Sequence, residues 1–137
     1  STALAILHDV PVRCEKDADM AALAVLYRAR DEFGCKQAQF HGYWEEGAAI
    51  AAATEGCWAS YWQHPQNGLL VAVANTGLEK QAVQVGVDWG KLGVHPVSVG
   101  TEVRGGSVVR VGKSGFKVSL KPQSWGLVWL RRAGEGE

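Results

Sequence analysis

Short apolar or alternating segments follow one another from residue 57 to residue 131, and a turn signal ends each of them. These signals return about every 8–12 residues, a spacing typical of all-β domains. Asn67-Gly68 is the strongest of them, because this dipeptide favours a tight hairpin, and the apolar run at residues 69–75 that follows it is typical of a buried strand. The pattern predicts a mainly β fold, an antiparallel β-sandwich of about 7–8 strands.

The segment QAVQVGVDW alternates in polarity along its length. Val83, Val85 and Val87 alternate with Gln84 and Gly86. Side chains two residues apart point to the same face of a strand. We therefore expect the three valines on the buried face of the sheet.

A strand and a helix are expected before the sandwich. Residues 3–7 are a continuous apolar run of strand length. A helix is predicted at residues 17–33, because Asp17 suits its N-cap and Gly34 suits the left-handed position after its end. We expect it to cover one face of the sandwich. Apolar residues recur at helical spacing at Met20, Leu23, Ala24, Tyr27 and Ala29 or Arg30, with Leu26 and Phe33 beside them.

The change in periodicity near residue 56 divides the chain. Residues 1–56 are interpreted as an αβ lead-in of strand, helix and aromatic loop, residues 57–133 as the sandwich, and residues 134–137 as a frayed tail. Residues 36–56 show no regular pattern. Their alanines fit a short helical turn or a segment that lies flat against a neighbour.

Charge and hydropathy exclude several partners. The chain has 14 Lys+Arg against 14 Asp+Glu, so its formal net charge of zero argues against a nucleic-acid partner. No apolar run reaches the roughly 18–20 residues of a membrane span, which argues against a membrane partner. The start of the chain lacks the features of a signal peptide, and its position inside an apolar run favours a fragment of a longer protein.

Cysteines and histidines indicate no metal site and no cofactor. The three cysteines are odd in number and without a CxxC spacing, so they predict no disulfide framework and no zinc site. We interpret them as three small core residues, and one disulfide with one free thiol is the alternative. They assign no compartment either, and a secreted or periplasmic parent protein stays open. The four histidines show no HxxxH or HxH spacing.

No complete catalytic motif is present. Glu45-Glu46 follow Tyr43-Trp44, and aromatic rings beside acids are typical of sugar sites. Adjacent residues point in different directions, however, whereas the two carboxyl groups of a glycosidase face each other across the bond that is cleaved. The pair is therefore interpreted as a solvated acidic loop. The serines lack a GxSxG elbow, and the glycines form no phosphate-binding loop.

Two pairs of tryptophans are more informative than these motifs. Trp58 and Trp62 lie four residues apart on one predicted strand, and so do Trp125 and Trp129, so each pair shares a face. We expect these rings in the core or at the joint with a neighbouring domain, because aromatic side chains mainly supply buried area. An exposed stripe that stacks sugars is the alternative.

Several segments together suggest a family. LAILHDVPVR, a helix ending in RDEFG, HGYWEEG, GLLVAVANTG, the DW-x-x-LG turn and LKPQSWGLVWL follow one another in this order. The chain resembles the C-terminal region of glycoside hydrolase family 123-like proteins, which are β-N-acetylgalactosaminidases, and more distantly the α-galactosidases. The resemblance implies a (β/α)8 barrel followed by a β-sandwich. Residues 1–34 then match the last barrel strand and helix, and residues 57–131 match the sandwich.

The resemblance also implies where substrate would lie. The acid pair of the family lies on earlier barrel strands, so no catalytic residue carries over to this chain. His8 and Asp9 match the C-terminal end of the final barrel strand, where barrel active sites lie. We expect them to contact substrate, followed by Tyr43 and Trp44, and Trp58 and Trp62 are the remaining candidates.

The sequence therefore predicts a non-catalytic C-terminal β-sandwich region of a glycoside-hydrolase-like protein. Its role would be to pack on a catalytic barrel and stabilise it, and activity is not expected from this chain alone. Two alternatives stay open: a standalone carbohydrate-binding module, and a structural protein that associates with another chain.

Overall fold

The computed structural model describes Leu7 and residues 17–131, with the side chains of Leu7 and of residues 24–131. The elements are α2 (Asp17–Phe33), the 3-10 helix η1 (Cys35–Gln37), β1 (Gln39–His41), β2 (Ile50–Ala52), β3 (Cys57–His64), β4 (Gly68–Asn75), β5 (Gln81–Val87), α3 (Trp89–Leu92), β6 (Val99–Glu102), β7 (Val108–Gly112), β8 (Gly115–Leu120) and β9 (Ser124–Leu130).

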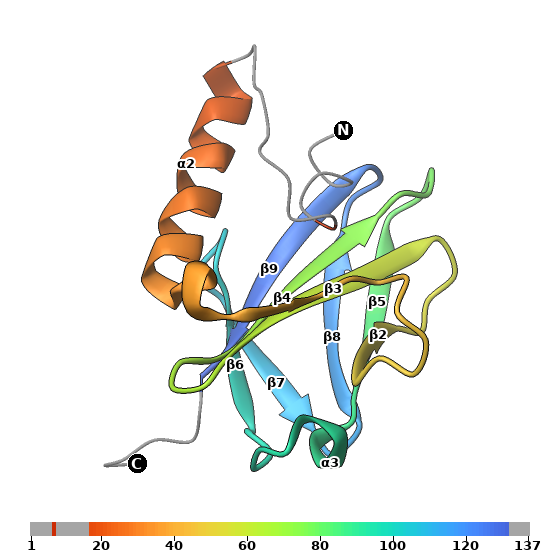
Figure 1. Ribbon diagram of the computed structural model, residues 1–137. Helices are drawn as coiled ribbons and strands as arrows, with labels where there is room; N and C mark the ends of the chain where they lie inside the picture. The colour runs from red at the N-terminus through yellow and green to blue at the C-terminus, as the bar shows by residue number, and fades with distance from the viewer. Residues whose placement is uncertain (1–6, 8–16, 132–137) are drawn as a thin grey trace.

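The nine described strands form one curled antiparallel sheet in the order β1-β3-β4-β9-β6-β7-β8-β5-β2, and α2 lies beside it (Figure 1). The predicted mainly β, antiparallel fold is confirmed. Two strands lie in the segment for which the sequence showed no pattern. β1 forms because Phe40 pairs with Trp62, and β2 forms because Ile50 pairs with Val87. Such pairing with distant strands leaves no local signal in three residues.

The predicted hairpin is present between β3 and β4. His64 pairs with Gly68, which has a φ of 93° that glycine adopts without strain. Every residue of β4 from Leu69 to Asn75 is buried. β4 lies in the middle of the sheet, with the interior of the curl on one face and α2 on the other, so both of its faces are covered.

The predicted alternation of β5 is also confirmed. Val83, Val85 and Val87 are buried, whereas Gln84 and Gly86 are partly exposed. The three valines belong to the core cluster inside the curl.

The DW-x-x-LG turn of the sequence follows β5. It contains the single helical turn α3, whose N-cap is Asp88. The carboxylate Oδ1 of Asp88 accepts a hydrogen bond from the backbone N–H of Lys91 at 3.1 Å, and Gly93 ends the turn in the left-handed conformation (φ 70°, ψ 26°). An aspartate at the N-cap and a left-handed glycine after the last turn are ordinary signals of the two ends of a helix, so the sequence contains both signals for α3.

At the N-terminal end the predicted helix is present as α2, and Gly34 is left-handed (φ 82°, ψ 46°). The buried stripe of α2 is Leu26, Ala29 and Phe33. Ala24 and Tyr27, which the sequence predicted for the apolar face of the helix, are exposed. The sheet covers only one side of the helix, and the three residues of the buried stripe lie on that side.

The predicted strand at residues 3–7 lies outside the described residues except for Leu7, which is helical instead of extended. A parallel barrel strand needs neighbouring strands to pair with, and residues 17–131 contribute only antiparallel strands. The predicted tail at 134–137 also lies outside the described residues. The domain boundary at residue 56 stays a prediction.

Candidate functional site

The contact between α2 and the sheet is the largest apolar feature outside the interior of the curl. We call this cluster the joint. It joins one face of β3, β4 and β9 to α2 and to Leu7, and its buried members are Leu7, Leu26, Ala29, Phe33, Trp62, Leu70, Ala72, Ala74, Trp125, Leu127 and Trp129.

Aromatic rings and one asparagine fix how α2 sits on the sheet. Phe33 meets the ring of Trp129 edge-on, with ring centroids 5.5 Å apart. Asn67 Nδ2 donates to the backbone oxygen of Phe33 at 2.8 Å, and the backbone carbonyl oxygen of Asn67 accepts from Trp129 Nε1 at 2.8 Å. The β3–β4 turn therefore holds the C-terminal end of α2 against β9, because one residue bonds to both.

A buried serine connects the joint to the aromatic loop, residues 40–45. The Ser60 hydroxyl is fully buried and donates to the Leu7 carbonyl oxygen at 2.7 Å, although the two residues are 53 positions apart. The Ser60 hydroxyl oxygen in turn accepts from the backbone N–H of Tyr43 at 3.0 Å. Leu7 and the aromatic loop are therefore neighbours. His8 and Asp9 follow Leu7 in the sequence and lie outside the described residues, so their contact with substrate stays a prediction.

The aromatic loop is held by its own side chains. Glu45 accepts from the backbone N–H of Gly42 at 2.7 Å and pairs with His41 Nδ1 at 3.1 Å. The Trp44 ring lies so close to Gly42 that a Cβ there would overlap it. His41 in turn stacks on Tyr61, with ring centroids 4.7 Å apart and an interplanar angle of 16°. Glu45 therefore holds the backbone of the aromatic loop, a role that the sequence did not predict. Its neighbour Glu46 is exposed, as predicted for a solvated acidic loop.

Three of the predicted site residues come together at the surface, and we call them the aromatic row: Trp44, Tyr43 and Trp58. The Tyr43 ring lies 5.3 Å from each of the other two. Trp44 is 55% exposed and Trp58 is 43% exposed, whereas Trp62 is 1% exposed within the joint. Trp58 and Trp62 therefore do not form an exposed stripe, although they lie on one strand.

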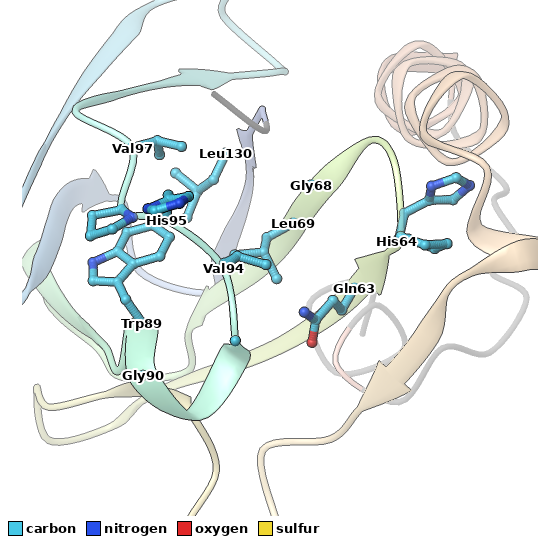
Figure 2. Close-up of a pocket in the computed structure, with 13 residues that line it drawn as sticks. Gln63, His64, Gly68, Leu69, Trp89, Gly90, Val94, His95, Val97 and Leu130 are labelled. Carbon is cyan, nitrogen blue, oxygen red and sulfur yellow. The ribbon is translucent and has the colours of Figure 1, made fainter. Parts of the chain in front are cut away.

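A separate pocket of about 780 Å³ opens at one end of the curl (Figure 2). Apolar side chains from β4, β9, α3 and the segment after α3 line it, and polar ones stand beside them. These residues are Leu69, Leu130, Trp89, Val94, Pro96 and Val97, with Gln63, His64 and His95. None of the described residues that the sequence singled out for substrate lines this pocket. Sequence reasoning missed it because residues 93–97 reach β4 only through the fold.

Within the described residues, no group of three or more His, Cys, Asp or Glu side chains is placed to hold a metal ion. Cys57 is a free thiol and is buried, as expected for a small core residue, whereas Cys35 is half-buried. No helix in the described part of the chain is long and apolar enough to cross a membrane.

Tyr61 gives the site a testable pH dependence. Burial raises the pKa of its phenol above the ordinary value of 10.0, and the nearby Glu45 carboxylate raises it further, while a backbone hydrogen bond at Ala49 lowers it. A group whose pKa is higher in the folded state contributes stability that is complete below its unfolded pKa and is lost as the pH rises through the folded one. We expect the free energy of unfolding to fall above about pH 10.

Urea denaturation of the unaltered chain and of Tyr61→Phe, at about pH 9 and about pH 11, checks this expectation. The variant should lose part of the alkaline decline. If both proteins decline equally, other groups cause the loss.

Residues 22–110 match the family described as glycoside hydrolase 123, C-terminal domain. The chain belongs to this family. The match includes most of α2 and the sheet as far as β7, and it confirms the resemblance that the sequence suggested. No curated protein matches the chain.

Two solved structures have a similar chain trace. The crystal structure of an AmyP variant in complex with maltotriose has a TM-score of 0.48 and 13% identity, over 62% of this chain and 16% of that one. AmyP in complex with maltose has a TM-score of 0.45 and 13% identity, over 63% and 17%. The chain thus spans about a sixth of the length of these proteins.

Proposed function

We propose that this glycoside hydrolase 123 C-terminal domain is a non-catalytic region that packs on a catalytic barrel and stabilises it through the joint. One observation supports this proposal above the others. α2 and Leu7, which the resemblance assigns to the end of the barrel, bury their apolar side chains against one face of the sheet. A helix of the barrel and the sheet would then share one hydrophobic cluster.

The size of the joint makes a stabilising role physically reasonable. Burial of a large apolar side chain contributes about 1.5–3 kcal/mol. Leu26 and Phe33 from α2, and Trp62 and Trp129 from the sheet, are all buried in this cluster. Unfolding of either partner would expose the apolar face of the other, so the two parts are expected to unfold together.

The test uses the glycoside hydrolase that contains this domain. Leu26→Ala removes a 1% exposed side chain of the joint and is expected to lower stability by about 2–5 kcal/mol. We expect the temperature of half-inactivation to fall by about 5 °C or more, while kcat and KM at room temperature stay unchanged. Heat-inactivation curves and steady-state kinetics on a chromogenic glycoside measure both.

Leu78→Ala is the matched control, because Leu78 is 90% exposed on the β4–β5 turn. It should leave both readouts unchanged. A Leu26→Ala enzyme with unaltered heat stability, or one that loses kcat without losing stability, would contradict the stabilising role.

A further inference from the structure

We propose that the groove between β2 and the start of β3 binds one pyranose unit of a glycan, with Tyr43 and Trp58 as its aromatic walls. This inference goes beyond the stabilising role, because none of the residues that line the groove is a buried member of the joint, although Tyr43 packs against it. The groove has a volume of about 390 Å³, and its lining includes Tyr43, Ala51, Ala53, Thr54, Glu55 and Trp58. Ligand pockets begin at about 300 Å³, so a single sugar ring is a suitable size.

The two aromatic walls are fixed before a ligand arrives. Their ring centroids are 5.3 Å apart and their planes are tilted by 54°. Trp58 Nε1 donates to Thr76 Oγ1 at 3.1 Å, and the Thr76 hydroxyl donates to the Gly56 oxygen at 3.0 Å, so the indole is held in one orientation. The hydrogen bond of the Tyr43 N–H to Ser60 fixes the backbone of the other wall. A preformed site loses less side-chain freedom on binding.

Hydrogen-bonding groups lie beside the rings. Glu55 is exposed, and its carboxylate has no hydrogen-bond or ion-pair partner among the side chains of residues 24–131, so it is available as an acceptor. Thr54 Oγ1 accepts from the backbone N–H of Gln84 at 2.9 Å, which leaves its hydroxyl proton to donate. Thr54 and Glu55 both line the groove, so it offers a donor and an acceptor to sugar hydroxyls, each of which both donates and accepts.

The chemistry of the groove favours a neutral sugar over other ligands. Among the described residues no cationic side chain lines it, and the Glu55 carboxylate repels anions. A pyranose presents an apolar C–H face to an aromatic ring and hydroxyls at its rim, and the groove has partners for both. The family places the domain in a glycoside hydrolase, where glycans are at hand. Trp44, 5.3 Å from Tyr43, extends the aromatic row for the next unit of a longer chain.

The test is saturation-transfer NMR on the 137-residue chain with methyl β-galactopyranoside and methyl β-glucopyranoside, which differ only at C4. We expect ring-proton saturation with at least one of them and a Kd in the millimolar range. Trp58→Ala should weaken binding about tenfold or more, since exposed rings at the centre of a site dominate its affinity. Glu55→Gln should weaken it several-fold, because an amide accepts less strongly than a carboxylate.

Two controls accompany these variants. Glu79→Gln matches Glu55→Gln as an exposed glutamate outside the groove, and Leu78→Ala matches Trp58→Ala as an exposed apolar side chain. Neither should change the affinity. Circular dichroism checks the fold of each variant, and Glu55→Gln alone decides the matter if Trp58→Ala does not fold.

Three results would overturn the proposal. The first is no saturation transfer from the unaltered chain to either glycoside. The second is equal affinity for Glu55→Gln and Glu79→Gln. The third is a Trp58→Ala variant that binds sugar normally but associates less well with the catalytic domain, because an apolar segment of that domain would then be the occupant. Failure here leaves the Leu26→Ala experiment on the joint unaffected, so the two proposals are separately testable.

Discussion

Replacing Trp62 by alanine is expected to lower the free energy of unfolding by about 3–5 kcal/mol. Trp62 is 1% exposed and lies under α2, with the Phe40 ring centroid at 5.1 Å and the Arg30 guanidinium at 5.5 Å from its ring. Removal of the indole leaves a cavity between the helix and β3 that neighbouring rings fill only in part. A domain of this size is stable by only about 5–15 kcal/mol, so the loss is a large part of the total. Urea denaturation followed by circular dichroism measures it.

Trp58→Ala is the matched control for this experiment. The two tryptophans lie on the same strand and the same face, but Trp58 is 43% exposed. Its replacement is expected to cost about 1 kcal/mol, mainly through the lost hydrogen bond to Thr76 and the contact with Tyr43. Similar losses for the two variants would mean that the joint adds nothing beyond ordinary surface packing.

Gly115→Ala is expected to destabilise the chain by at least about 3 kcal/mol. Gly115 begins β8 with a φ of 141°, a region that L residues rarely adopt. A Cβ at this position would overlap the backbone carbonyl oxygen of Val85 on the neighbouring β5. The backbone of β5 is paired with β8 on one side and β2 on the other, so it cannot move aside as a flexible side chain does. β5 and β8 would therefore have to separate where Val85 pairs with Phe116.

Gly56→Ala separates the two causes. Gly56 has a φ of 75°, and nothing lies within 4 Å of the position a Cβ would occupy, so only the backbone conformation is penalised. We expect a loss of about 1–2 kcal/mol. Denaturation curves for both variants give the comparison. Equal losses would assign the whole effect at Gly115 to φ and contradict a clash with Val85.

The elements that the sequence predicted are those with a local cause. The β3–β4 hairpin follows from Asn67-Gly68, and the alternation of β5 follows from its valines. The elements that it missed depend on partners far along the chain. β1 and β2 have three residues each and exist because β3 and β5 offer them hydrogen bonds. α3 is an intermediate case, since its caps Asp88 and Gly93 are local signals but one helical turn is too short to show a helical period in the sequence.

The candidate site divides in the same way. The sequence placed Tyr43, Trp44 and Trp58 among the candidates, and the fold brings these three together at the surface. It grouped Trp62 with Trp58 because strand geometry puts them on one face. In the fold, α2 covers Trp62 and leaves Trp58 exposed, and strand geometry does not determine where α2 lies. The groove next to Trp58 also depends on the fold, because Glu55 carries no motif of its own.

The sequence by itself determined the mainly β class, the helix before the sheet, and the family. These follow from periodicity, turn residues and an ordered set of short segments, all of which act over a few neighbouring residues. The tertiary structure alone decided the strand order, the buried stripe of α2 and the difference between Trp58 and Trp62. Burial depends on which distant element lies against a face, and that contact forms between segments such as Leu7 and Ser60 that are 53 residues apart.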